Sequence, residues 1–413
     1  MTITVKDKEL SRQSAALVEN APVSHAPDTS DEKPRLDEET RKKGEKLQSE
    51  SPVEDKYMMS GSKMLWHMDR IVDWQKGKRI APLHIDAGMS KGCNIRCEYC
   101  YGATQGNFFK ESAKKYFPRE PLMQFMKDAG ELGVRSIALI GEAEPTLNPH
   151  LYEAIVTGSK AGVDMSIGTN GILFDTGEQG EEALEHLEWI RFNISAASKE
   201  SYELIHASKA FDTAVKKIQF CVDTKRKKNL NVTVGLQMVL TPNNVDQAIP
   251  LARLGRELGA DYLVIKQCSD TVNNQIGIFE RLHEYHSFEN LLKAAERESA
   301  GNYRVIVKWK KITNEGKRDY DQCLGVPFLL YTSGDGKVYP CGMFFDYLED
   351  EYRMGDMTKM TFKEIVESDR YWEVVQKVAQ INVHKKCYSN CRTDCINSFL
   401  WKLKNPPAHV NFV

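Results

Sequence analysis

Residues 89–100 read Met89-Ser90-Lys91-Gly92-Cys93-Asn94-Ile95-Arg96-Cys97-Glu98-Tyr99-Cys100 and follow a short apolar stretch, residues 83–87, that is typical of a β-strand. Three thiolates on one short loop can hold one face of a metal centre. A structural zinc site takes four protein ligands, and the nearest residues offer no obvious fourth. Three ligands on a four-iron cluster leave one iron open, and an open iron can bind a small molecule. The loop therefore indicates a metal centre at the end of the first strand.

The other cysteines are also clustered. Ten cysteines in 413 residues are too few for a disulfide scaffold. The first 20 residues lack the apolar region of a secretory signal, so we expect a reducing, cytoplasmic location. In such a compartment clustered cysteines bind metals or take part in redox chemistry. Outside the first loop the clustered cysteines are Cys323, Cys341, Cys387, Cys391 and Cys395, and two others stand alone, Cys221 and Cys268.

Composition excludes several classes of protein. Hydrophobic residues make up 41% and charged residues 28%, which is enough for a sizeable core and excludes a collagen-like or fully disordered chain. Lys and Arg number 56 against 58 Asp and Glu, so the net charge of −2 does not favour a nucleic-acid partner. No run of about 18 apolar residues exists, so no membrane span is expected.

The chain divides into four expected parts. Residues 1–56 are dense in charged and polar residues and poor in aliphatic ones, which predicts a disordered tail. Residues 57–81 form a helical lead-in with an amphipathic helix near 64–74. Residues 82–309 and 310–413 form the two folded domains.

Short apolar runs alternate with helical patterns from residue 82 onwards. The expected strands are 83–87, 136–140, 164–168, 190–195, 232–240 and 262–266, and the expected helices between them are 122–132, 151–161, 181–187, 211–225 and 245–258. Each unit has the size of a βαβ repeat. Six such units predict an α/β fold with a parallel sheet, as a partial barrel or an open sheet. Chemistry in these folds lies at the carboxyl ends of the strands.

The C-terminal region breaks this alternation. A helix at 288–298 and a strand at 303–309 lead to a predicted β-hairpin, 328–332 and 337–339, followed by helices at 362–378 and 393–403. This α+β region contains five of the cysteines and is too small for a large core of its own. Metal binding would stabilise it.

The spacing CxxxCxxC at Cys93, Cys97 and Cys100, with Tyr99 before the last cysteine, resembles the radical S-adenosylmethionine (SAM) superfamily over about residues 82–270. The resemblance implies a partial (β/α)6 TIM-like barrel. It also implies that the three cysteines bind a 4Fe–4S cluster whose open iron chelates the amino and carboxylate groups of SAM. One electron from the reduced cluster cleaves SAM to methionine and a 5′-deoxyadenosyl radical, which abstracts a hydrogen atom from the substrate.

Positions that contact SAM are also implied by the resemblance. Gly141-Glu142-Ala143-Glu144-Pro145 is similar to the family's GGEP motif, with Glu144 on the SAM amino group, although two glycines are replaced. Polar residues after later strands, Thr169, Asn170 and Ser195, match positions that touch the ribose or the carboxylate. Tyr99 is expected on the adenine side. For Thr169, Asn170 and Ser195, turn formation is the competing explanation.

The hairpin cysteines resemble the opening of a SPASM or twitch domain. Cys323, twelve residues, Gly336, four residues and Cys341 match its Cys-x12-Gly-x4-Cys pattern. A full SPASM domain has seven cysteines and two auxiliary clusters, whereas five are present here. One auxiliary 4Fe–4S cluster is therefore predicted, with the ligands Cys323, Cys341, Cys387 and Cys391. Cys395 is the expected spare, and zinc remains an alternative metal for four cysteines.

The layout resembles enzymes that oxidise or epimerise sugars and aminocyclitols, which predicts a small-molecule substrate. Peptide-modifying SPASM enzymes, including sulfatase maturases, are the alternative. They often have an N-terminal peptide-recognition domain, for which residues 1–63 are too polar. A reductase such as flavodoxin or ferredoxin is the implied electron donor, and no catalytic side chain is assigned. A non-catalytic iron–sulfur protein for electron transfer or redox sensing is the alternative of another class.

Overall fold

The computed structural model describes residues 57–100, 115–270, 276–345 and 348–412. The tail predicted over residues 1–56 lies outside the described residues. The chain separates into two compact units, Met1–Met59 and Ser60–Val413. Every element named below belongs to the second unit.

The described residues form one sheet of ten strands, in the order β10-β9-β8-β1-β2-β3-β4-β5-β6-β7. From β8 through β1 to β7 all neighbours are parallel, whereas β8, β9 and β10 pair antiparallel. The bounds are β1 His84–Ala87, β2 Ser136–Leu139, β3 Asp164–Thr169, β4 Leu187–Asn193, β5 Thr233–Leu240, β6 Tyr262–Gln267, β7 Arg304–Val307, β8 Leu329–Thr332, β9 Lys337–Tyr339 and β10 Gly355–Asp356.

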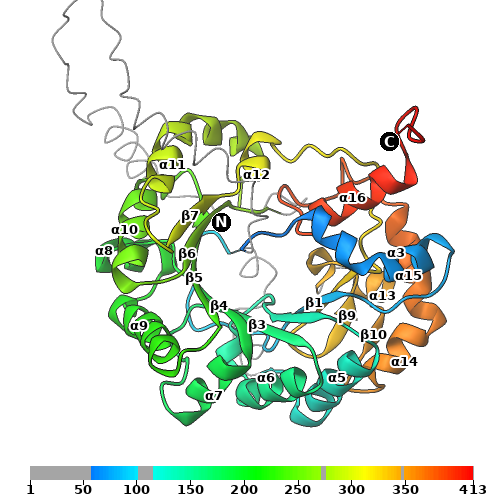
Figure 1. Cartoon of the computed structure of the whole chain (residues 1–413), viewed down its shortest axis with the longest axis horizontal. Helices are drawn as coiled ribbons and strands as arrows, with labels where there is room; N and C mark the ends of the chain where they lie inside the picture. Colours follow the sequence, from blue (N-terminus) through cyan, green and yellow to red (C-terminus); the bar gives the residue numbers. More distant parts are fainter. Residues whose placement is uncertain (1–56, 101–114, 271–275, 346–347, 413) are drawn as a thin grey trace, which may run out of the picture. The chain divides into compact units, whose positions relative to one another are not determined.

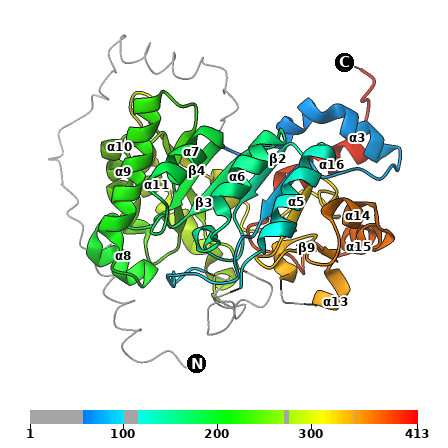
Figure 2. The ribbon, with the colours of Figure 1, turned by 90° about the horizontal axis from the view of Figure 1, so that it is seen from below.

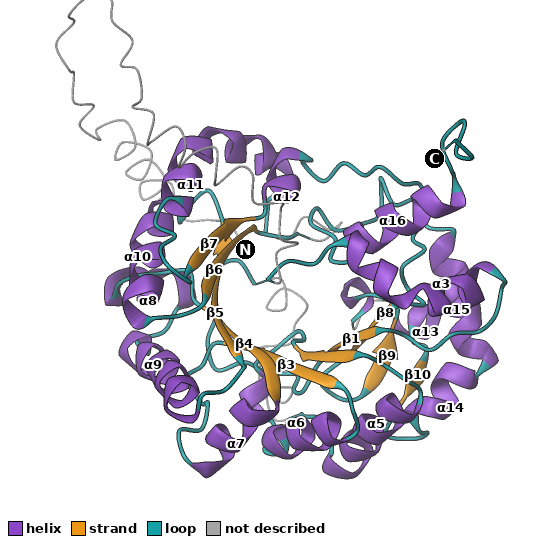
Figure 3. Ribbon diagram, viewed as in Figure 1, coloured by secondary structure: helices purple, strands orange, loops and turns teal. Residues whose placement is uncertain are grey.

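Helices cover the outer face of this sheet. Figure 1 shows β1 to β7 as an arc with α5 to α11 outside it, and Figure 3 shows the same layers by element type. The helices of the barrel are α5 Arg119–Glu131, η3 Pro145–Leu147, α6 Leu151–Lys160, α7 Glu178–His186, α8 Lys199–His206, α9 Phe211–Lys228, η4 Val245–Gln247, α10 Ala248–Leu258, η5 Phe279–Phe288, α11 Glu289–Glu296 and α12 Trp309–Thr313.

The remaining helices surround the hairpin end of the sheet, where α14 also packs on α5 (Figure 2). They are η1 Gly61–His67, α3 Met68–Gln75, η6 Gly342–Phe344, α13 Glu349–Tyr352, α14 Phe362–Glu367, α15 Asp369–Ala379 and α16 Asp394–Lys404. No helix in the described part of the chain has the length and apolar character that crossing a bilayer requires.

The two faces of the sheet differ in polarity. On β4, Ile190 and Phe192 are fully buried under the outer helices, whereas Trp189, Arg191 and Asn193 point to the inner face and keep partial exposure. Side chains alternate between the faces of a strand, so β4 contributes one apolar row and one polar row. The inner face can therefore hold polar chemistry while the outer face forms the core.

The predicted α/β class, the parallel sheet and its six strands are confirmed. The strand predicted at 303–309 is present as β7, and the hairpin predicted at 328–332 and 337–339 is present as β8 and β9. The structure adds their place in the sheet, with β7 parallel to β6 and β8 parallel to β1. It also adds α8, which has few apolar residues and is short, so its periodicity is weak. The single helix predicted at 362–378 is two helices, because Ser368 is extended and its side chain accepts a hydrogen bond from the Tyr371 amide.

Candidate functional site

Three thiols of the loop after β1 lie close enough to influence one another. The pKa of Cys93 is raised to about 12, first by burial and then by Glu144, with Cys100 contributing. Burial also raises the pKa of Cys97, and the charges of Cys100 and Cys93 are the next causes of that rise. Thiols in this state are protonated, and metal binding would displace the protons, because metals bind the thiolate form. The structure thus brings together the three predicted ligands Cys93, Cys97 and Cys100.

Sequence analysis does not single out His206, which directly contacts this loop. The imidazole Nδ1 lies 3.1 Å from Cys97 Sγ, although the residues are 109 positions apart. The Ser195 amide donates to His206 Nε2 at 3.0 Å, and burial lowers the pKa of His206 to about 4. The ring is therefore neutral with its proton on Nδ1, and Nδ1 donates a hydrogen bond to the Cys97 sulfur. The backbone of α8 also holds the loop, since His206 O accepts from the Arg96 amide at 3.2 Å.

Replacing His206 by phenylalanine should make an iron–sulfur cluster held by this loop harder to reduce. Hydrogen bonds to ligand sulfurs stabilise the reduced, more electron-rich cluster. A lost N–H···S bond worth about 1 kcal/mol corresponds to about 40 mV in a one-electron couple. The measurement is a redox titration of the loaded protein monitored by electron paramagnetic resonance. His206→Asn, which can place an amide N–H near the former Nδ1, should recover much of the shift; an unchanged potential in His206→Phe would contradict the role.

Glu144 joins the loops after β1, β2 and β3. Its Oε1 accepts from Thr169 Oγ1 at 2.5 Å and from the Thr146 amide and hydroxyl at 3.1 and 2.7 Å, and its Oε2 accepts from the Asn170 amide at 2.8 Å. Burial raises the pKa of Glu144, and these donors act against that rise. The carboxylate is fixed in one orientation, and Oε2, which accepts one hydrogen bond from the described residues, has the capacity to accept another.

Asn170 extends this network to the cysteine loop. Its side-chain amide donates to Asn94 Oδ1 at 2.7 Å and lies 3.9 Å from Cys93 Sγ. Thr169, in contrast, is fully buried, and its hydroxyl also accepts from the Gly171 amide at 2.9 Å. The structure therefore brings Glu144, Thr169 and Asn170 to one place beside Cys93.

A further contact joins Tyr99, which is within the cysteine loop, to Ser195, which follows β4. The Ser195 hydroxyl donates to Tyr99 Oη at 3.0 Å and accepts from the Val239 amide at 3.1 Å, and Ser195 is fully buried. The Tyr99 ring is 8% exposed and lies edge-on to His206. Both side chains thus hold the loop in place, while their predicted contacts with SAM stay predictions. Cys268 is buried behind this loop, with its sulfur 3.7 Å from Tyr99 O.

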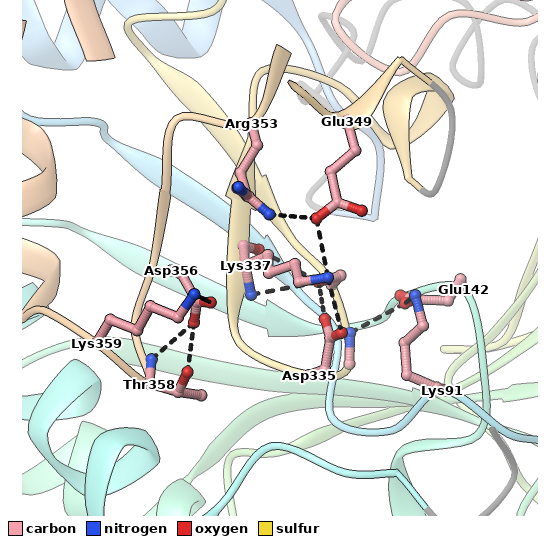
Figure 4. Close-up of polar contacts among 11 residues, drawn as sticks. Lys91, Glu142, Asp335, Lys337, Glu349, Arg353, Asp356, Thr358 and Lys359 are labelled. Atoms are coloured by element: carbon pink, nitrogen blue, oxygen red, sulfur yellow. Dashed lines mark hydrogen bonds and ion pairs between the residues drawn. The ribbon is translucent and has the colours of Figure 1, made fainter. Parts of the chain in front are cut away.

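Glu142 replaces a glycine of the GGEP pattern, and its side chain makes contacts that a glycine could not make. Its Oε1 lies 3.5 Å from Lys91 Nζ and accepts from the Gly334 amide at 3.0 Å (Figure 4). Burial raises the pKa of Glu142 to about 7. Lys91 precedes Cys93 and Gly334 is in the turn of the C-terminal hairpin, so Glu142 connects the cysteine loop to the hairpin. A side chain at Gly334 would collide with the backbone of Ser90.

The predicted ligands of the second site also come together. The pKa values of Cys323 and Cys341 are both raised. Burial is the main cause, and Cys391 is the next cause in each case. A hydrogen bond between Cys387 and Cys391 raises the pKa of Cys387 and lowers that of Cys391. Burial also raises the pKa of Cys395, but its electrostatic neighbours are Lys311, Asp394 and Arg392 and include no cysteine.

Two cations and an amide adjoin these four cysteines. Arg318 lies near Cys387 and Cys391, and Lys311 donates to the Cys391 carbonyl. Asn397 Nδ2 lies 3.6 Å from Cys323 Sγ, while its Oδ1 accepts from the Leu324 and Gly325 amides at 2.8 and 2.7 Å. Sequence analysis did not identify these residues, because nothing in their spacing marks them.

Arg392 connects the second site to the first strand. Its guanidinium donates to Asp86 Oδ1 at 2.6 Å and pairs with Oδ2, and His84 Nε2 lies 2.9 Å from the same Oδ1. Burial by itself raises the pKa of Asp86, but Arg392 and His84 outweigh it and leave that pKa below its ordinary value. Asp86 is on β1, seven residues before Cys93, and Arg392 follows Cys391.

Both groups of cysteines fit iron–sulfur clusters by the chemistry of their donors. Clusters are held by cysteine thiolates, and N–H···S bonds and nearby cations tune them. Among the described residues, no three His, Cys, Asp or Glu side chains converge on a single metal ion. A cluster does not require such convergence, because each thiolate binds a different iron.

Family models match both parts of the chain. The radical SAM superfamily model matches residues 88–254, and the SPASM iron–sulfur cluster-binding domain model matches residues 323–396. The first covers the loop with Cys93, Cys97 and Cys100 and the strands β2 to β5. The second covers all five C-terminal cysteines.

Individual proteins are similar at low identity. The "AdoMet-dependent heme synthase" of Methanosarcina barkeri is 21% identical over 341 residues, covering 76% of this chain and 91% of that protein. The "GTP 3',8-cyclase" of Helicobacter pylori is 28% identical over 155 residues, 37% of this chain and 46% of that protein. The chain thus spans about half the length of this cyclase.

A solved structure shares the fold. The crystal structure of Streptococcus suis SuiB bound to the precursor peptide SuiA covers 94% of this chain and 83% of its own, with a TM-score of 0.56 and 14% identity. At this identity the likeness shows the fold alone. The two family models make the chain a radical SAM superfamily enzyme with a C-terminal SPASM iron–sulfur cluster-binding domain.

Proposed function

We propose that this enzyme cleaves SAM reductively at the site of Cys93, Cys97 and Cys100 and abstracts hydrogen from a small, carbohydrate-like substrate. The substrate would be oxidised or epimerised. The observation that carries the proposal is the placement of the three-thiol loop between two hydrogen-bonded networks, one through Glu144 and Asn170 and one through His206. The chemistry supplied by a loaded site of this kind is one-electron cleavage of SAM to methionine and a 5′-deoxyadenosyl radical.

Different residues would hold different groups of SAM. Glu144 Oε2 accepts one hydrogen bond from the described residues, from Asn170, and can accept another from the SAM ammonium group. Thr169 and Thr146 fix that carboxylate, so it needs little reorganisation when SAM binds. We expect Tyr99 at the adenine, Thr169, Asn170 and Ser195 near the ribose and carboxylate, and a flavodoxin or ferredoxin as reductant.

The C-terminal domain would hold one auxiliary 4Fe–4S cluster with the ligands Cys323, Cys341, Cys387 and Cys391. Their mutual influence supports this set, and Cys395, next to Lys311 and Arg392, is the fifth thiol outside it. An auxiliary cluster can accept an electron from a substrate radical and complete a two-electron oxidation. A cytoplasmic location belongs to this proposal, because such thiolates need a reducing compartment.

The proposal is tested by anaerobic reconstitution, followed by dithionite and SAM. About eight irons per chain and the formation of 5′-deoxyadenosine are expected, since two 4Fe–4S clusters are proposed. Loaded protein that never cleaves SAM would refute the proposal and leave a non-catalytic iron–sulfur protein.

The substrate is then identified by deuterium transfer into 5′-deoxyadenosine from a labelled panel of nucleotide sugars, aminocyclitols and peptides. A heme precursor belongs in the panel because the M. barkeri relative is named a heme synthase.

A further inference from the structure

Basic side chains gather on the inner face of the sheet, near its carboxyl edge. Arg191 is on β4, Lys266 is near the end of β6, and Lys308 directly follows β7. Figure 3 shows these three strands in one arc. The strand register continues from Ile265–Val307 to Lys266–Lys308, and Lys308 N donates to Ile265 O at 3.0 Å. The two lysines are therefore neighbours on adjacent strands.

Among the described residues, the side-chain ammonium groups of Lys266 and Lys308 have no hydrogen bond and no ion pair. Arg191 interacts with the Tyr262 side chain and lies near Asp86. Arg191 is stacked over the Trp189 ring, 4.8 Å from its centroid, and its buried Nε has no hydrogen-bond partner among the described residues. Asp86 is the carboxylate near Arg191, and it is already paired with Arg392 and His84.

The arrangement costs folding free energy unless an anion compensates it. Burial lowers the pKa of Lys266 to about 7, with Arg191 and Arg392 as the next causes. Burial also lowers the pKa of Lys308, and the neighbours that act on it are Arg191, Lys266, Arg392 and Lys311. The three side chains keep partial exposure, which lessens the cost, but unpaired charges in desolvating surroundings are still unfavourable.

The auxiliary cysteines do not explain this group. Lys311 and Arg318 are the cations that lie beside Cys391 and Cys387. Lys266 and Lys308 are instead on the strands that line the inner face, where a barrel enzyme holds its substrate.

We propose that Arg191, Lys266 and Lys308 bind an anionic group of the substrate, a phosphate or a carboxylate. This inference rests on the proposed function and narrows its substrate class to small molecules that carry negative charge. A phosphorylated or carboxylated sugar fits, whereas a cationic aminocyclitol does not. Guanidinium and ammonium groups are the usual partners of both anions.

The test is isothermal titration calorimetry on the reconstituted enzyme with succinate, its neutral analogue succinamide, and inorganic phosphate. The enzyme should bind succinate or phosphate at least tenfold more tightly than succinamide. Lys266→Met and Lys308→Met should each weaken anion binding about tenfold, and the double variant should abolish it. Lys227→Met, which removes the same charge from an exposed position on α9, should change nothing. A preference for phosphate or for succinate identifies the source of the anion.

A pH series separates anion binding from a purely structural role. An anion stabilises the protonated lysine, so affinity should fall as the pH rises from 6.5 to 8.5 through the pKa of Lys266. The groups facing that amine are Arg191, Arg392, Lys308, Lys311 and Cys268, and burial lowers the pKa of Lys308 and Lys311 as well. Lys266→Met should therefore lose the part of this pH dependence that Lys266 contributes, and it should unfold at no lower temperature, because it removes an unpaired cation.

Equal affinity of the wild type for succinate and succinamide, or unchanged affinity in the double variant, would overturn the inference. Its failure is distinct from failure of the proposed function. Wild-type enzyme that cleaves SAM but binds neither anion refutes the inference alone. Enzyme that binds the anions but never cleaves SAM refutes the proposed function alone.

Discussion

Replacing Cys93, Cys97 and Cys100 together by alanine is expected to abolish formation of 5′-deoxyadenosine while about four irons per chain remain. The three thiols come from one loop, and removing them eliminates one cluster site. The second group of cysteines is on the hairpin and the C-terminal loop, and it does not depend on these thiols for ligands. The loss of activity should be complete, because without the first cluster no electron reaches SAM.

The measurements are iron and sulfide content after anaerobic reconstitution and 5′-deoxyadenosine by liquid chromatography. Cys221→Ala is the matched control, because Cys221 is a fully buried thiol on α9 outside both groups. This control should keep about eight irons and the wild-type activity. If the triple variant retains no iron, the auxiliary cluster is refuted; if it still cleaves SAM, the assignment of the first site is refuted.

Asp86→Ala is expected to lower the free energy of unfolding by about 3 kcal/mol, because it leaves Arg392 as an uncompensated, partly buried cation. Asp86 is 3% exposed and carries the charge that Arg392 and His84 share. The nearby cations Arg191, Lys266 and Lys308 would repel the unpaired Arg392 and so increase this loss of stability. Thermal unfolding of the reconstituted protein measures the effect, as a drop of several degrees in the midpoint.

The control for this prediction is an exposed ion pair. Arg79 and Asp369 are 2.5 Å apart with side chains 53% and 84% exposed, so Asp369→Ala should change stability by at most about 0.5 kcal/mol. Adding Arg392→Met to Asp86→Ala should recover part of the loss, because it removes the unpaired charge. Equal midpoints for Asp86→Ala and Asp369→Ala would show that the pair does not hold the C-terminal loop against β1.

Local sequence patterns predicted most of the elements and the three cysteines proposed as ligands of the first site. The spacing of Cys93, Cys97 and Cys100 lies within one loop, and the alternation of apolar strands and amphipathic helices lies within windows of about 30 residues. Glu144 was predicted from the resemblance of residues 141–145, which follow the second strand, to the family's GGEP motif. These features depend on neighbours in sequence, so they can be read without knowing how the chain closes.

Contacts between distant segments were decided by the tertiary structure. His206 meets Cys97 across 109 positions and Arg392 meets Asp86 across 306, and no spacing rule joins such pairs. The parallel pairing of β8 with β1, which brings the hairpin beside the cysteine loop, likewise depends on how the sheet continues past its first strand. Lys266 and Lys308 read as ordinary lysines in sequence, and only the strand register makes them neighbours without a counter-charge among the described residues. The sequence by itself indicated the family and the proposed sulfur ligands, whereas tertiary structure determined the hydrogen bonds and charges around those cysteines, because burial and register arise only when distant strands pair.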